Sequence, residues 1–320
     1  NGGINQKQNE KKNPLITKQN CLMDLGNWRE EKINQMLADA RKLKSPHERM
    51  KYIAMQFIDT AFSYESLTDI TPAGTLRVRL SAFDCITFGH YMLALTLSKN
   101  FDEFITNLVK IRFKDPEILG INCHPIEGNI LDFTYNVYLV NAVNRGMVKN
   151  CTDEILARKG LKPGTITLVL KPLHRTSDLG GGLVVPKYGI QEVSVNYIPT
   201  EDIDKVAADI RTGYMILFVM PFKSDRPKAI FGHGAIAIKG KDLPGTLRKN
   251  IGIPDDDNIF FIHATKSRNT EGKAIGVNIA GQETYLDSLI YDSTKPRLLS
   301  HYCRGVGWRG VVILRPLSTF

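Results

Sequence analysis

The stretch FDCITFGHYMLALTL, residues 83–97, places a cysteine between an aspartate and a long apolar run. The run predicts a core helix that begins at Cys85. A helix N-terminus carries unpaired N–H groups and partial positive charge, so it favours a thiolate and can hold an oxyanion. The position therefore suits a nucleophile. It also suits a small core residue, because free cysteines are among the most buried side chains.

The composition is that of a globular protein, with 42% hydrophobic and 23% charged residues among 320. The net charge of +9 favours polyanionic partners, such as nucleic acid, an acidic cell-wall polymer or a membrane surface. However, the basic residues are scattered, and the sequence has neither zinc-finger spacing nor an aromatic RNA-binding motif. We therefore predict a solubilising surface and no nucleic-acid partner. No apolar run is long enough to cross a bilayer.

The sequence predicts helices first and strands afterwards. Ser45, Pro46 and Glu48 form the start signal of one helix, because Ser45 can cap it and Glu48 can close a capping box. Segment 160–200 is rich in Gly and Pro and predicts loops and short strands. The predicted helices cover 27–43, 46–62, 85–97, 100–113, 129–145 and 200–211, and the predicted strands cover 76–80, 213–220, 235–240, 259–264, 274–279 and 310–315. This order favours an α+β fold with a mainly antiparallel sheet.

A nucleophilic cysteine needs a base, usually histidine, and a group that orients the base. Two of the seven histidines stand out, because His233 precedes an apolar strand in FGHGAIAI and His263 lies near the end of the next strand in IFFIHAT. Adjacent strands could bring these imidazoles together, so that one orients the other. An ordinary strand histidine is the alternative for each alone.

Five cysteines are present, and none lies in a C-x-x-C pair, which argues against zinc. Cys85 is the one that we expect to be free. The pairing of the other four cannot be read from the sequence; they are Cys21, Cys123, Cys151 and Cys303.

Together these segments resemble the NlpC-type papain-like cysteine hydrolases of cell walls. The resemblance rests on F-D-C-I-T-F at a helix start, then H-G-A-I-A-I, then F-I-H-A-T followed by G-V-N-I. The similarity is greater to an amidase-like branch, long catalogued as a domain of unknown function, which has D-C-x-T-F at the cysteine. Ile111 to Lys114, NAVNRGMV at 141–148 and Tyr197 to Pro199 also match that branch, and the resemblance spans residues 55–320.

The resemblance implies a papain-like core in which the nucleophile helix packs on a mainly antiparallel β-sheet. It implies Cys85 as nucleophile, His233 as general base and His263 as the orienting residue. Further candidates for oxyanion or substrate contact are Tyr64, Asp84, Arg112, Tyr197 and Gly234. The chain departs from the branch at NCHPIE, residues 122–127, where an Arg-His-Tyr-like segment is usual.

The expected function is hydrolysis of peptidoglycan by an N-acetylmuramoyl-L-alanine amidase that acts on muropeptides, including anhydro-muropeptides. A γ-D-glutamyl-diaminopimelate endopeptidase and an inactive wall-binding protein on the same fold are the alternatives. No metal or organic cofactor is expected, and the oligomeric state is open.

Residues 1–20 are predicted to form a disordered or linker tail, and 21–320 a single catalytic domain with an N-terminal helical extension. Because the first residue is Asn1, we expect a removed signal peptide and a periplasmic or exported location; cytosolic recycling of muropeptides would also fit.

Overall fold

The computed structural model describes residues 21–63, 76–112, 135–170, 191–221, 230–268, 274–279 and 298–318. The remaining residues include the predicted tail at 1–20, the NCHPIE segment, Tyr64 and Cys123. Predictions that concern those residues therefore lie outside the described part of the chain.

The centre of the molecule is an eight-stranded sheet with the strand order β11-β10-β9-β8-β12-β7-β6, and β5 pairs with β12 at one end. Every pairing in this sheet is antiparallel, which confirms the predicted sheet type. Its strands are β5 Val148–Asn150, β6 Gly164–Leu170, β7 Gln191–Pro199, β8 Met215–Val219, β9 Phe231–Lys239, β10 Ile259–Arg268, β11 Ala274–Ile279 and β12 Gly310–Pro316. Two small parallel pairs join β1 Cys21–Asp24 to β3 Leu76–Arg79, and β2 Ala61–Phe62 to β4 Ala82–Phe83.

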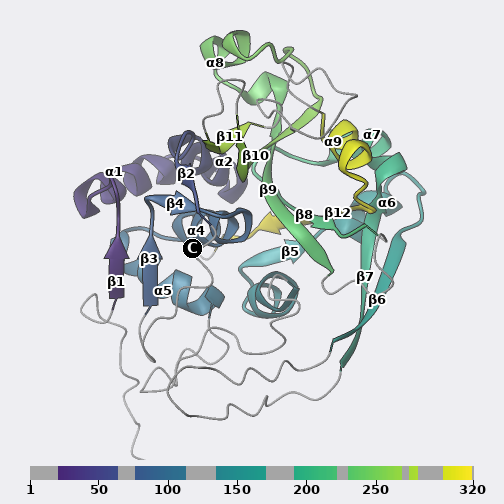
Figure 1. The fold of residues 1–320 in the computed structure, drawn as a ribbon, viewed down its shortest axis with the longest axis horizontal. Helices are drawn as coiled ribbons and strands as arrows, with labels where there is room; N and C mark the ends of the chain where they lie inside the picture. The colour runs from purple at the N-terminus through teal and green to yellow at the C-terminus, as the bar shows by residue number, and fades with distance from the viewer. Residues whose placement is uncertain are drawn as a thin grey trace, which may run out of the picture.

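Helices cover both faces of the sheet, as Figure 1 shows. The longer helices are α1 Glu30–Arg41, α2 Pro46–Gln56, α4 Cys85–Thr96 and α5 Phe101–Arg112, and they share one hydrophobic core with the sheet. A π-helix, η4 Tyr135–Ala142, follows in the chain. The second core contains side chains of α6 Thr152–Ala157, α7 Ile203–Val206 and α9 Leu299–Val306. The short segments η5 Thr200–Asp202, η6 Ala207–Asp209, η7 Gly240–Asp242 and α8 Gly245–Asn250 complete the described helices.

The α4 helix is the structural centre of the first core. Every residue from Thr87 to Thr96 is buried, as expected of a helix that is apolar on all sides. Asp84 caps the helix, because its Oδ1 accepts hydrogen bonds from the N–H groups of Ile86 at 2.8 Å and Thr87 at 2.7 Å. The predicted start of a helix at Cys85 is confirmed, and its side chain lies in the first turn.

Several predicted boundaries are confirmed. The capping box of α2 forms between Ser45 and Glu48, with Pro46 at the first helical position. Asn100 caps α5 through a 2.9 Å bond from the N–H of Glu103. The strands predicted at 76–80 and in the C-terminal third are present as β3, β8, β9, β10, β11 and β12.

Three predictions from the sequence are corrected. The helix predicted to reach Phe62 ends at Gln56, because the chain turns at Asp59 and pairs with β11 through Asp59 N–H to Val277 O and Val277 N–H to Thr60 O, both 2.8 Å. Segment 160–200 contains two long strands, β6 and β7, rather than only loops and short strands. The helix predicted for 200–211 is broken into short turns, and Thr200 Oγ1 donates to the carbonyl of Trp308 instead of capping it.

A single glycine allows the turn at Thr60 to lie against β11. Gly276 has φ +74°, and a Cβ at this position would overlap the carbonyl oxygen of Thr60. Gly252 has a similar φ of +69°, but nothing lies within 4 Å of the position of its missing Cβ. An alanine at Gly252 would therefore introduce backbone strain alone, whereas an alanine at Gly276 would introduce the same strain and a steric overlap.

We predict that Gly276→Ala destabilises the protein more than Gly252→Ala does. Gly252→Ala should cost about 1–2 kcal/mol from the left-handed backbone alone, and Gly276→Ala should add about 1–3 kcal/mol from overlap. Urea unfolding followed by circular dichroism measures both values. Equal losses in the two variants would show that the Thr60 turn does not depend on this contact.

Candidate active site

The two histidines that the sequence singled out form a hydrogen-bonded pair. His233 Nε2 lies 2.7 Å from His263 Nδ1, and their ring planes are nearly perpendicular at 81°. His233 is 9% exposed and His263 is fully buried. Adjacent strands bring the imidazoles together as predicted, with β9 supplying one and β10 the other.

The pair lies where the two strands separate. The ladder between β9 and β10 runs from Lys239–Ile259 to Ile236–Ile262 and stops there, whereas β10 continues to pair with β11 as far as Arg268. His233 and His263 therefore lie beyond the last β9–β10 backbone pair. Their side chains, and not the backbone ladder, bridge the strands at this point.

Gly234, the residue after His233, lies against the N-terminus of α4. A Cβ on Gly234 would lie 3.3 Å from the carbonyl oxygen of Cys85, which is tighter than most such contacts. The backbone N–H of Gly234 also hydrogen-bonds to the sulfur of Cys85, which lowers the pKa of the thiol. Because Gly234 follows His233 in the chain, the sulfur lies against backbone adjacent to the imidazole pair. Helix α4 packs against both β9 and β10.

The helix N-terminus does not make Cys85 acidic, contrary to the expectation from sequence. Burial and, to a smaller extent, the carboxylate of Asp84 raise the pKa of the thiol to about 12, against weaker lowering by the N–H groups of Gly234, Cys85 and Ile86. The thiol is therefore protonated at neutral pH unless a base takes its proton.

Four aromatic residues surround the imidazole pair. Phe218 lies 5.2 Å from His233 and Phe261 lies 5.0 Å from His263, measured between ring centroids. Tyr302, from α9, lies 6.2 Å from His233 and 6.0 Å from His263, and Trp308 lies nearly parallel to His233 at 14° and 6.5 Å. These rings fix the imidazoles in the second core and exclude water from one side of the pair.

The sequence did not identify these aromatic neighbours. Helix α9 was not predicted, although Gly307, with φ +83°, is a typical C-terminal signal at the end of it. The contact between His233 and Tyr302 joins segments that are far apart in the chain, so local sequence patterns do not predict it.

The other predicted site residues are not gathered at the pair, except Gly234. Asp84 is buried and its carboxylate caps α4, and its role as an oxyanion or substrate contact stays a prediction. Arg112 is 7% exposed; its Nη1 donates to Arg77 O at 2.9 Å, and its guanidinium lies over the ring of Tyr91. Tyr197 lies on β7, and β8 and β12 separate that strand from β9. Tyr64 lies outside the described residues.

Among the described residues, Cys85, Cys151 and Cys303 are free thiols. Within the described ranges, no group of three or more His, Cys, Asp or Glu side chains could hold a metal ion. None of the described helices is long and apolar enough to span a membrane.

The sequence from residue 52 to residue 225, more than half of the chain, matches the family model AmiA-like, described as N-acetylmuramoyl-L-alanine amidase-like. The chain belongs to the AmiA-like family. The region that matches the AmiA-like model includes Cys85 and ends before His233 and His263. The histidine pair is therefore an observation that the structure adds to the family assignment. Comparison with curated proteins gave no match.

Solved structures show the same fold at low sequence identity. An N-acetylmuramoyl-L-alanine amidase from Bacteroides uniformis is 19% identical, with a TM-score of 0.56 over 85% of this chain and 99% of its own. A Legionella pneumophila protein of no stated activity is 18% identical, with a TM-score of 0.61 over 91% and 97%. A Bacteroides fragilis protein with a provisional xylanase name is 20% identical, with a TM-score of 0.53 over 82% and 98%. The likeness shows that this AmiA-like chain shares their fold.

We predict that alkylation of Cys85 depends on His233. Because burial holds the pKa of the thiol high, iodoacetamide should react with Cys85 at neutral pH only when His233 can accept the proton. His233→Gln keeps the size and a hydrogen-bonding group but removes the base, so labelling of Cys85 should slow by at least ~10-fold. Peptide mass spectrometry measures the rate at each cysteine.

Cys21 is the internal control, since it is partly exposed and lies on β1. Its labelling rate should not change in His233→Gln. Unchanged labelling of Cys85 in this variant would show that the sulfur ionises without the imidazole.

Proposed function

We propose that the protein is a cysteine hydrolase that cleaves the amide between N-acetylmuramic acid and L-alanine in muropeptides, including those that end in an anhydro sugar. The observation that carries the proposal is the histidine pair beside Gly234, whose N–H bonds to the sulfur of Cys85. Membership of a family described as amidase-like supports the reaction class. The name of the Bacteroides uniformis neighbour supports the choice of amide.

In the proposed reaction, His233 takes the proton of the Cys85 thiol, and the sulfur attacks the lactyl carbonyl carbon. Since Nε2 of His233 faces His263, Nδ1 is the nitrogen assigned to this proton. The C–N bond then breaks, and the proton passes from His233 to the leaving amine of L-alanine. Water, deprotonated by His233, hydrolyses the thioester and releases the lactyl carboxylate and the thiol.

His263 has a supporting role in this proposal. If His233 donates its Nε2 proton to His263 Nδ1, the orientation of the His233 ring is fixed and the imidazolium formed during the reaction is stabilised. The surrounding aromatic rings restrict both imidazoles. His263 is therefore a positioning residue, and Cys85 and His233 are the catalytic residues.

The N–H of Cys85 is the proposed oxyanion donor. Asp84 already accepts hydrogen bonds from the N–H groups of Ile86 and Thr87, so the first N–H of α4 is the one that its carboxylate does not engage. We propose Tyr64 as a second donor from the family resemblance. Arg112 and Tyr197 remain proposed substrate contacts on the same basis.

The arrangement of a cysteine at a helix start and two histidines on an antiparallel sheet supports assignment to the NlpC-type papain-like hydrolases. We propose a periplasmic or exported location, because intact peptidoglycan lies outside the cytoplasm. Cytosolic recycling of muropeptides is the alternative. The proposed reaction needs no cofactor.

Wild-type protein should convert purified anhydro-muropeptide to free anhydro-disaccharide and an intact peptide. Cys85→Ala should lower the rate by at least ~10³-fold, because it removes the nucleophile, and His233→Gln should lower it by roughly 10²–10⁴-fold, because it removes the base. Cys21→Ser is the matched control and should keep the wild-type rate. Mass spectrometry of the products provides the measurement.

The same products separate the alternatives. A sugar that retains an L-Ala-D-Glu stub would identify a γ-D-glutamyl-diaminopimelate endopeptidase instead. Binding without any cleavage, together with a Cys85 that labels no faster than Cys21 or Cys303, would identify an inactive wall-binding protein.

A further inference from the structure

A polar cavity lies away from the histidine pair. It has a volume of about 90 Å³ and is lined by residues of α6, of the turn η6, of the start of β8 and of the end of β12. The pair lies near Phe218, at the other end of β8 from Met215, so about 10 Å of strand separates the two sites. The cavity is therefore independent of the proposed reaction centre.

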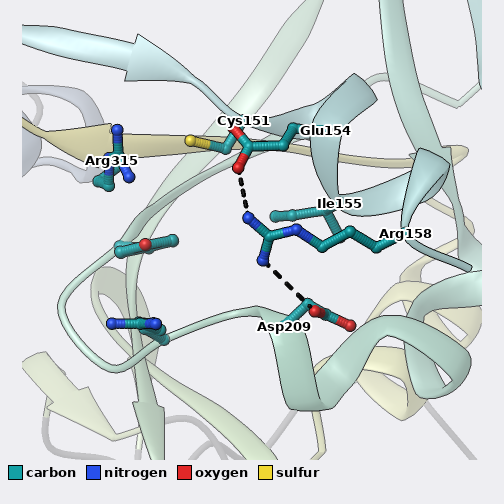
Figure 2. A pocket seen from close by; sticks show the side chains of 8 residues that line it. Cys151, Glu154, Ile155, Arg158, Asp209 and Arg315 are labelled. Atoms are coloured by element: carbon teal, nitrogen blue, oxygen red, sulfur yellow. Dashed lines mark hydrogen bonds and ion pairs between the residues drawn. The ribbon is translucent and has the colours of Figure 1, made fainter.

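One wall of this cavity is electrically balanced. Arg158 lies between Glu154 and Asp209 and forms ion pairs with both, as the dashed lines in Figure 2 show. Lys149 adds a second ion pair to Glu154 at 2.8 Å, and Lys159 adds one to Asp209 at 3.3 Å. Each carboxylate is thus matched by two cations, so this wall does not repel an anion as two free acids would.

The other two cationic residues of the cavity form no ion pair within the described residues. Arg211 and Arg315 both line it, and neither forms an ion pair with any residue in the described part of the chain. Figure 2 shows Arg315 beside Cys151, across the cavity from Arg158 and Asp209.

The pKa values of two neighbouring side chains, His47 and Cys151, respond to these guanidinium groups. Burial lowers the pKa of His47, Glu48 and Asp242 raise it, and Arg211 and Arg315 both lower it. Burial raises the pKa of the Cys151 thiol, and Arg315 acts in the opposite direction. Two guanidinium groups that form no ion pair within the described residues therefore lie around one small cavity.

We propose that this cavity binds a phosphate group, held between Arg211 and Arg315. The planar guanidinium group matches the geometry of phosphate oxygens and forms paired, charge-assisted hydrogen bonds with them. The charge also fits, because phosphate carries about −1.5 to −2 at neutral pH and two guanidinium groups are uncompensated. A monocarboxylate would neutralise only one of them.

The size of the cavity limits what can occupy it. One water molecule needs about 10–15 Å³ of such space, so a cavity of about 90 Å³ has room for several waters. Inorganic phosphate fits as a whole, and a larger molecule would place only its phosphate there, with the rest outside.

The test measures the stability of the full chain with inorganic phosphate, at an ionic strength kept constant with sodium chloride. Because a ligand that binds only the folded state stabilises it by mass action, phosphate should raise the Tm of the wild type. Acetate at the same ionic strength should have little effect. Isothermal titration calorimetry with inorganic phosphate gives the affinity directly.

Arg211→Gln and Arg315→Gln should each weaken phosphate binding by at least ~10-fold, since each removes one charged, bidentate partner. Arg248→Gln is the matched control, because Arg248 is paired with Asp255 on a different part of the surface and should leave binding unchanged. Neither cavity variant should change the labelling rate of Cys85. Circular dichroism shows whether the variants fold, and Arg211, which is exposed, is the substitution that the fold tolerates more readily.

Phosphate affinity that is equal in the wild type and both variants would overturn the proposal. An equal rise in Tm with sodium chloride or acetate would also overturn it, since the effect would then be ionic strength or any anion. The result of the phosphate test does not depend on whether the protein cleaves muropeptides, so the two proposals can fail separately.

Discussion

The close approach of the first turn of α4 to Gly234 is the contact on which the site depends. With only 3.3 Å between the position of a Cβ at residue 234 and the carbonyl oxygen of Cys85, a side chain there would displace the helix or the strand. The same approach lets the strand backbone hydrogen-bond to the sulfur. Because the β9–β10 ladder has already ended, the two imidazoles lie where backbone pairs would otherwise continue. At this point a hydrogen bond between two side chains replaces the regular pairing of the two strands.

Much of this arrangement could be predicted from the sequence. The apolar run after Cys85 and the histidines near the ends of two strands gave the elements and the pairing of imidazoles, because these patterns are local and the strands are consecutive in the main sheet. The capping box at Ser45 was predicted for the same reason. A short pattern of side chains specifies a helix start, whatever the rest of the chain does.

What could not be predicted depends on distant contacts. The early end of α2 follows from pairing with β11, more than two hundred residues later, and the aromatic residue supplied by α9 reaches the histidine pair from the far end of the chain. The acidity of Cys85 was predicted in the wrong direction because the helix terminus was considered without its surroundings. Burial and the Asp84 carboxylate outweigh the favourable N–H groups.

The Asp84 cap has a chemical consequence beyond holding the helix. Peroxides attack the thiolate form of cysteine, and the thiol form oxidises slowly. Burial of the sulfur and, after it, the carboxylate that fixes the first turn both disfavour ionisation and so favour the less oxidisable thiol form. The residue that stabilises the helix therefore also makes the adjacent sulfur a poorer target for peroxides.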